Sequence, residues 1–166
     1  GNSIKRTGFY GIEISIVGAV TNSSLVNIKV TNNTVELAGY NWRPTDVTGR
    51  GIHVDAGQAT STLNNIFVSE NTLTNCRWGL SELTRGSSAN GVVFSRNLVT
   101  TNRSPSNGRG IFMSGSVLFT GNILDGYVYG IYAYGSTGTP TMRCYNNTVL
   151  NCTNGVMQDG TTGTIQ

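Results

Sequence analysis

The sequence predicts an all-β fold in which short strands stack into one solenoid domain. Three observations favour this fold class: the composition, a repeated eight-residue motif, and a glycine that recurs between its copies. Gly, Thr, Asn and Ser make up nearly half of the 166 residues, whereas Ala occurs six times and Lys twice. Because residues that favour helices are this scarce, the composition excludes a helical bundle and a coiled coil.

The repeated motif consists of an apolar residue, any residue, a second apolar residue, two residues, Asn, one residue and a third apolar residue. Alternation of apolar and other residues is typical of a half-buried strand, so each copy predicts a short strand that ends in a bend at the asparagine. Successive asparagines are 38, 26, 25 and 25 residues apart, which gives the length of each coil. They are Asn33, Asn71, Asn97, Asn122 and Asn147.

A second motif lies between these copies and consists of Gly followed by an apolar residue that opens another alternating run. Each coil therefore contains three predicted strands: one that ends at the Asn, one that follows it, and one that begins at the Gly. We expect both the Asn and the Gly to adopt left-handed backbone at the two bends. The glycines are Gly11, Gly51, Gly79, Gly110, Gly130 and Gly155.

Strands this short are not stable alone, so the coils must stack on one another. Stacking pairs each strand with its counterparts about 4.8 Å above and below. The inward apolar residues then form an internal core. The asparagines are predicted to form a side-chain ladder, with each amide bonded to the next.

These motifs resemble those of the right-handed parallel β-helix family, the pectate-lyase-like superfold, over nearly all of residues 8–160. The resemblance implies a single-stranded right-handed parallel β-helix solenoid of about 5–6 coils. The composition, rich in Asn, Thr and Ser and poor in Lys, is most similar to that of bacteriophage tailspike and tail-appendage proteins. No cap is visible at either end, so we expect residues 1–166 to form one β-helix domain within a longer solenoid.

The resemblance to tailspikes implies a function in host recognition. We expect the domain to bind a bacterial surface polysaccharide and to be located in the virion tail. Whether it also depolymerises the polysaccharide is left open by the sequence. Two alternatives remain: a secreted, monomeric pectate-lyase-like hydrolase, lyase or epimerase, and a passive structural spacer.

One outward row of the first strands is apolar in three consecutive coils, at Phe67, Val93 and Leu118. Exposed apolar stripes mark subunit interfaces, and the tailspike resemblance implies a parallel homotrimer that buries this one. The alternative is that residues 84–90 or 103–109 fold over the stripe. The sequence therefore predicts either a trimer contact or a covered surface.

The outward positions after each glycine, together with the longest insertion at residues 39–50, combine aromatic and charged residues. Aromatic rings stack on the C–H faces of sugars, and charged planar groups pair with sugar hydroxyls, so we expect a carbohydrate-binding face. Alternatively, the aromatic residues fill the ladder against one another. Phe112 is expected to stack on Tyr132, and Glu13 to neighbour His53. The candidate carbohydrate-binding residues are Trp42, Arg43, His53, Trp78, Phe112, Tyr132 and Tyr134.

The candidate catalytic residues are Asp55, Glu82 and Glu13, because glycoside hydrolysis requires two nearby carboxyl groups. Asp55 and Glu82 end the third strand of successive coils, which predicts a separation of roughly 5–8 Å. Strict alternation points Glu82 inward, where a carboxylate is costly, so we expect it to turn outward at the strand end. His53 is either a general base or an ordinary surface residue. The sequence has no carboxylate cluster suited to calcium and none of the paired Asp and His-Gly motifs of the polygalacturonases, which argues against both of these enzyme types. If the domain is an enzyme, a hydrolase is favoured over a lyase.

The remaining composition narrows the list of partners. Charged residues are 11% of the chain, and the arginines are scattered, so no nucleic-acid partner is expected. No apolar stretch approaches the roughly 20 residues of a membrane span, so no membrane insertion is expected. The three cysteines have no C-x-x-C pattern and are predicted to be free thiols. The sequence predicts no metal site and no cofactor.

Overall fold

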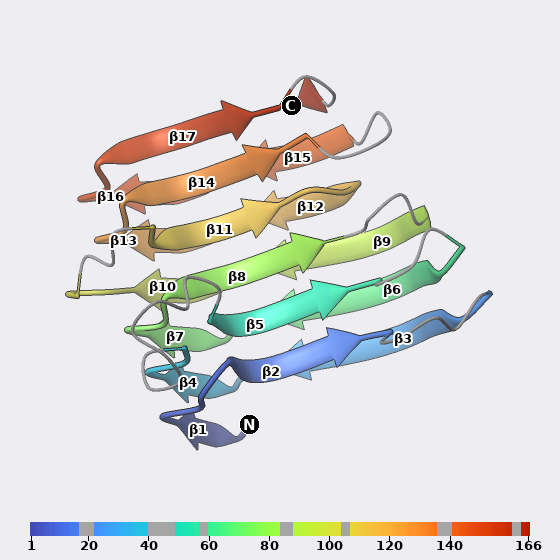
Figure 1. Ribbon diagram of the computed structural model, residues 1–166, viewed down its shortest axis with the longest axis horizontal. Coiled ribbons are helices and arrows are strands. Elements are labelled where there is room, and N and C mark those ends of the chain that lie inside the picture. The colour runs from blue at the N-terminus through green and yellow to red at the C-terminus, as the bar shows by residue number, and fades with distance from the viewer. Residues whose placement is uncertain are drawn as a thin grey trace.

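The computed structural model describes residues 1–16, 22–39, 49–56, 60–83, 88–103, 107–135, 141–160 and 164–166. Every regular element in these ranges is a β-strand, and all strand pairs are parallel, which confirms the all-β prediction. Among the described residues, no helix is long and apolar enough to cross a membrane. The strands stack into three sheets of six, so the chain is a parallel β-solenoid (Figure 1).

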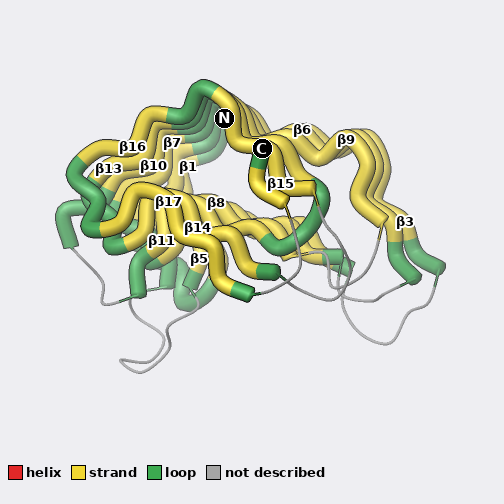
Figure 2. Tube along the Cα trace, turned by 90° about the horizontal axis from the view of Figure 1, so that it is seen from above, coloured by secondary structure: helices red, strands yellow, loops and turns green. Residues whose placement is uncertain are grey.

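Each coil contributes one strand to each sheet, and the view along the stack shows the strands of a sheet lying over one another (Figure 2). Sheet A contains the short strands that follow the ladder asparagines. Its members in spatial order are β1 (Ser3–Lys5), β4 (Thr34–Glu36), β7 (Thr72–Thr74), β10 (Leu98–Thr100), β13 (Ile123–Asp125) and β16 (Thr148–Leu150).

Each of the six strands of sheet B begins one residue before the recurring glycine, and this sheet carries the candidate site. Its strands are β2 (Tyr10–Ser15), β5 (Arg50–Asp55), β8 (Trp78–Leu83), β11 (Arg109–Met113), β14 (Tyr129–Tyr134) and β17 (Asn154–Asp159). Sheet C contains the strands that precede the asparagines. Its strands are β3 (Ser24–Thr31), β6 (Thr62–Ser69), β9 (Ser88–Ser95), β12 (Val117–Thr120), β15 (Thr141–Tyr145) and β18 (Thr164–Ile165).

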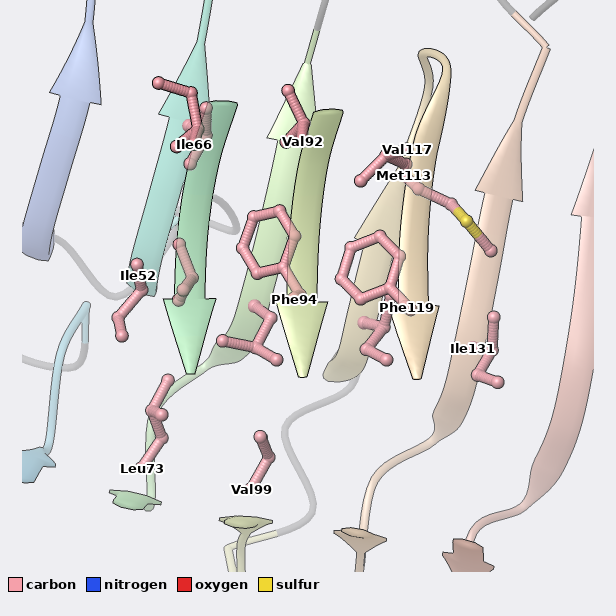
Figure 3. Packing of buried hydrophobic residues seen from close by; sticks show 14 of the residues in the cluster. Ile52, Ile66, Leu73, Val92, Phe94, Val99, Met113, Val117, Phe119 and Ile131 are labelled. Carbon is pink, nitrogen blue, oxygen red and sulfur yellow. The ribbon is translucent and has the colours of Figure 1, made fainter. Parts of the chain in front are cut away.

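The core lies between the three sheets and is built from stacked copies of the same inward position (Figure 3). Phe94 and Phe119 occupy one such position in neighbouring coils, with ring centroids 4.5 Å apart and an interplanar angle of 14°. Leu73 and Val99 close the core from sheet A, and all four side chains are fully buried. Alternation along each strand therefore translates directly into a continuous apolar interior.

The predicted asparagine ladder is present. The Nδ2 of Asn71 donates to Oδ1 of Asn97 at 2.9 Å, and the backbone N–H of Asn71 donates to the same oxygen at 3.0 Å. The same pair of bonds joins Asn33 to Asn71, Asn97 to Asn122, and Asn122 to Asn147. Asn2 bonds to Asn33 in the same way and so extends the ladder by one residue, although Asn2 does not belong to a copy of the repeated motif.

The expectation of left-handed backbone at the ladder asparagine is wrong by one residue. The residue before each ladder asparagine has φ between +52° and +63°, and the asparagine itself does not. The ladder asparagine needs extended backbone for its side chain to reach the next coil. The strained left-handed conformation therefore falls on the residue before it. The left-handed residues are Asn32, Glu70, Arg96, Gly121 and Asn146.

The recurring glycine also has a reason other than the predicted one. Gly79 does not have a positive φ. A Cβ atom there would overlap Cγ1 of Val99 and the carbonyl oxygen of Gly110 in the next coil. A Cβ atom at Gly51 or Gly130 would overlap the equivalent side chain of sheet A and the equivalent carbonyl oxygen of the next coil. The motif therefore selects glycine for close packing between sheets A and B, not for backbone freedom.

Within the described residues, sheet C has longer strands of eight residues in three coils, β3, β6 and β9. In β3 and β6 the strand continues past a left-handed residue, Asn27 or Asn65, whose side chains are joined by a 3.2 Å hydrogen bond. Gly91 occupies the same place in β9 with φ +68°. β12 is four residues long and lacks the extension. This difference explains the short run of chain between Gly110 and Asn122.

Candidate functional site

The outer face of sheet B carries three rows of side chains in register across the coils. The middle row contains the outward residues predicted after each glycine, and it places Glu13 beside His53 as expected. Phe112 lies beside Tyr132, with ring centroids 6.0 Å apart and planes inclined by 20°, which confirms their predicted stacking. The full row is Glu13, His53, Ser81, Phe112, Tyr132 and Met157.

The row before the glycines alternates aromatic rings and guanidinium groups, a feature that is not among the sequence predictions. The guanidinium carbon of Arg50 lies 5.5 Å from the Tyr10 ring and 4.9 Å from the Trp78 ring. That of Arg109 lies 4.1 Å from the Trp78 ring and 4.0 Å from the Tyr132 ring. Cation–π attraction therefore links five coils of one face into a single layer. The signal in the sequence is that a cation or an aromatic residue precedes Gly in five copies.

This layer is more deeply buried than an open binding ridge would be. Trp78, Phe112 and Tyr132 are 5–6% exposed, although they lie on the face opposite the core. The indole N–H of Trp78 is bonded to the backbone oxygen of Asn107 at 3.0 Å. Tyr134 is the exception, since 44% of it is exposed. Most of these rings therefore pack against one another along sheet B, which is the alternative that the sequence also predicted.

His53 is fully buried within the same layer. Its Nε2 lies 3.0 Å from Nη1 of Arg50, and its Nδ1 lies 2.8 Å from Oγ of Ser81. A guanidinium can only donate, so Nε2 accepts and the proton of the neutral ring is on Nδ1. Burial lowers the pKa of His53, against the opposing effect of Asp55, whose Oδ2 lies 3.5 Å from Nε2.

The hydrogen bonds of His53 determine which chemistry it can perform. Because Nδ1 already donates its proton to Ser81, the ring cannot take the proton of that hydroxyl. Ser81, His53 and Asp55 are therefore not arranged as a nucleophile, a base and an orienting carboxylate. The cluster holds β5 against β8 and fixes the imidazole in one tautomer.

The expectation that Glu82 turns outward is wrong. Glu82 is fully buried and is in register with Val54, an inward position of β5. Its Oε2 accepts hydrogen bonds from the backbone N–H groups of Ser114 (3.1 Å) and Gly115 (2.7 Å). These bonds offset the cost of burying the carboxylate where the chain leaves β11. Asp55 pairs with Leu83, so Asp55 and Glu82 lie on opposite faces of sheet B.

The other predicted catalytic carboxylates lie on the outer face. Glu13 is exposed and, with Phe9 and Tyr10, lines a recess of about 550 Å³. The side chain of Asp55 is 17% exposed. The structure thus places Glu13, His53 and Asp55 on one face and separates Glu82 from them.

The predicted stripe on sheet C is a register row, with Phe67 beside Val93 and Val93 beside Leu118. Lys29 and Arg143 extend it at its two ends. Phe67 is 38% exposed, and the other two apolar side chains are half-buried. A subunit contact at this stripe stays a prediction.

The three thiols are free, as predicted. Burial raises the pKa of Cys76 to about 12 and that of Cys144 to about 11, so both are protonated at neutral pH. Protonated thiols are poor nucleophiles and poor metal ligands. Within the described ranges, no group of three or more His, Cys, Asp or Glu residues is placed to hold a metal ion.

Two of the predicted carbohydrate-binding residues, Trp42 and Arg43, lie outside the described residues. Of the others, Tyr134 is accessible, and His53, Trp78, Phe112 and Tyr132 form the buried layer beneath and beside it. In comparisons with known proteins, no family model matches the chain, and neither a curated protein nor a solved structure matches it.

Proposed function

We propose that this solenoid binds a bacterial surface polysaccharide on the outer face of sheet B, with Tyr134 as its central contact. The observation that carries the proposal is an exposed aromatic ring held in place by buried ones. Tyr134 lies 6.4 Å from Phe112 between ring centroids, with an interplanar angle of 26°, and remains 44% exposed. A ring fixed in this way can stack on a sugar with little loss of side-chain entropy.

A carboxylate beside the ring supports the same function. Asp159 is in register with Tyr134 and is exposed. Burial and the bond to Asp159 raise the pKa of Tyr132, so its phenol keeps its proton and donates to Oδ2 of Asp159 at 2.5 Å. The carboxylate is thereby oriented, and its remaining acceptor sites are available to sugar hydroxyls.

The finer parts of the proposal come from the resemblance to tailspikes. They are a right-handed coil of about 5–6 turns, a place in a virion tail, and host recognition through the polysaccharide. The solenoid geometry supports the last of these, since a stack of parallel coils presents an elongated face suited to a chain of sugars. Depolymerisation is a separate step that binding at Tyr134 does not require.

The test is the binding of purified capsular and O-antigen polysaccharides to the wild-type chain and to Tyr134→Ala, measured by isothermal titration calorimetry. We expect the substitution to weaken binding at least about tenfold, because it removes the stacking surface. Tyr145→Ala is the matched control, since Tyr145 is also 44% exposed but lies on sheet C. Equal losses in the two variants, or no binding by the wild-type chain, would overturn the proposal.

A further inference from the structure

The two end faces of the solenoid present strand edges. The first end face consists of β1, β2 and β3, and the last end face, at the opposite end of the stack, consists of β16, β17 and β18 (Figure 1). Among the described residues, each of these strands pairs with another strand on one side only. The other side offers backbone N–H and C=O groups, which are a template for pairing with a further strand.

Apolar residues of the core are uncovered at both end faces. Val156 is 61% exposed, although it is in register with Ile131, which is 4% exposed. Ile4 and Ile12 are half-buried on the first end face, whereas the residues in register with them in the next coil are fully buried. They line a recess of about 510 Å³. Each end face therefore exposes apolar surface that a further coil would cover.

The asparagine ladder ends differently at the two faces. Each asparagine donates to Oδ1 of the asparagine one coil later, as Asn122 does to Asn147. Within the described ranges, Asn147 has no later asparagine to donate to, and Oδ1 of Asn2 accepts from no earlier one. The last end face thus presents the donors of a rung, and the first end face presents its acceptor.

The end coils also differ in charge. The first coil, residues 1–31, contains three basic residues and one acidic residue. Residues 147–166, in the last coil, contain one acidic residue, Asp159, and no Lys or Arg. Unlike faces therefore attract each other, whereas two copies of the first end face repel. The polarity of the ladder and the charges favour the same contact, between the first face and the last. The basic residues are Lys5, Arg6 and Lys29.

Gly155 supplies an independent observation. A Cβ atom at Gly130 would overlap Cγ1 of Val149 and the carbonyl oxygen of Gly155 in the next coil. A Cβ atom at Gly155 would meet no described atom within 4 Å, and Gly155 does not have a positive φ. In a second copy stacked on the last end face, Ile4 and Gly11 would occupy the positions of Val149 and Gly155. A stacked copy thus requires the glycine that the single chain does not.

We propose that the last end face of one chain binds the first end face of a second copy of this chain, and that the copies form a head-to-tail filament. Asn147 of one copy donates to Oδ1 of Asn2 in the next, and the rows of Ile4 and Ile12 continue the core. A contact between unlike faces at opposite ends does not close on itself, so it propagates from copy to copy. The inference does not depend on sugar binding.

The experiment measures particle length against chain concentration by small-angle X-ray scattering and negative-stain electron microscopy. Six coils make one copy about 29 Å long, so stacked particles should lengthen in steps of about this size. A length that does not rise with concentration would overturn the inference, and the end faces would then be covered by something other than a second copy.

Gly155→Ala should weaken the association at least about tenfold, because the added methyl group overlaps the second copy. The methyl group has room in the single chain, so circular dichroism and urea unfolding in dilute solution should be unchanged. Ser116→Thr is the matched control, since it adds one methyl group at an exposed position in a middle coil and should change the association less than twofold. Equal losses in the two variants would count against stacking at the end faces.

A mixing experiment tests the direction of stacking. Gly155→Ala keeps the first end face intact, so it should bind the last end face of a wild-type chain and stop further growth there. Wild-type particles should therefore become shorter when a minor fraction of Gly155→Ala is added. Wild-type particles that keep their length in an excess of this variant would overturn the head-to-tail arrangement.

Phe67→Glu separates stacking from association through the side of the solenoid. Phe67 faces outward from sheet C in the second coil and belongs to neither end face. Growth in length that persists in Phe67→Glu supports contact at the end faces. Growth that is lost in Phe67→Glu and kept in Gly155→Ala assigns it to the side of the solenoid and overturns the inference.

Discussion

His53 shows how a single buried side chain makes stability depend on pH. The ring is neutral in the folded chain, since it accepts from Arg50 and donates to Ser81, and burial lowers its pKa from the ordinary value of 6.5. As the pH falls below about 6.5, the unfolded chain takes up a proton that the folded chain does not. The contribution of His53 is therefore fully present above pH 6.5 and is lost as the pH falls toward its folded-state pKa.

We predict that His53→Gln makes the free energy of unfolding less dependent on pH between about 7 and 5. Gln cannot take up the proton, and its amide can still accept from Arg50 and donate to Ser81. Urea unfolding at pH 7, 6 and 5 measures the difference between the two chains. An identical slope in both would show that His53 does not control this range.

The inward side chain of Glu82 agrees with one sequence expectation and contradicts another. Strict alternation predicts an inward side chain, and the structure places it inward. The cost of a buried carboxylate predicts the opposite, an outward side chain. That cost is offset by the backbone N–H groups of Ser114 and Gly115, which are 32 and 33 residues away in the sequence. Partners at such a distance cannot be identified from the residues around Glu82.

At the scale of the element, the asparagine ladder is the bend that joins sheets C and A. Each internal rung accepts two hydrogen bonds at Oδ1 from one neighbour and donates two to the next, one from its backbone N–H and one from Nδ2. Its Nδ2 also bonds to a strand carbonyl. Because Asn71, Asn97 and Asn122 are 0–1% exposed, water cannot replace a lost bond. The ladder therefore fixes the register of every coil on its neighbour.

We predict that Asn97→Ala lowers the free energy of unfolding by about 3 kcal/mol, since it leaves several buried polar groups without partners. Asn2→Ala is the control, because Asn2 makes the same bonds to Asn33 but is exposed to water. It should cost less than about 1 kcal/mol. Chemical denaturation of both variants provides the measurement. Comparable losses would contradict a role for burial in the strength of the ladder.

At the scale of the whole molecule, sheets A and C both expose apolar side chains. Phe67 is 38% exposed on sheet C, and Leu98 is 40% exposed on sheet A. The row of Phe67 continues through two further apolar residues, Val93 and Leu118, whereas that of Leu98 continues through one, Ile123. A longer stripe favours association between copies, because small exposed apolar groups are ordinary on protein surfaces.

We predict that the chain forms a homotrimer and that Phe67→Glu dissociates it, because a carboxylate buried between subunits would lack a partner. Sedimentation equilibrium over a range of concentrations measures the mass. Leu98→Glu should leave the trimer intact, because Leu98 lies on sheet A and not on this stripe. A monomeric wild-type chain, or a trimer that survives Phe67→Glu, would contradict this assembly.

The sequence by itself determined the three-strand coil, the inward residues and the asparagine ladder. These features depend on period-two alternation and on residues that recur at the spacing of one coil. Contacts between coils join equivalent positions, so a repeat in the sequence is also a repeat in space. For this reason Phe112 and Tyr132 could be paired before their separation was known.

Only the tertiary structure decided which outward residues are accessible and where the surface is hollow. Trp78 and Tyr134 are both outward aromatic residues of sheet B, yet one is 5% and the other 44% exposed. The alternating layer of Arg50, Trp78 and Arg109 arises where coils differ from one another. Exposure depends on how neighbouring side chains cover one another, and the periodicity of the sequence does not contain that information.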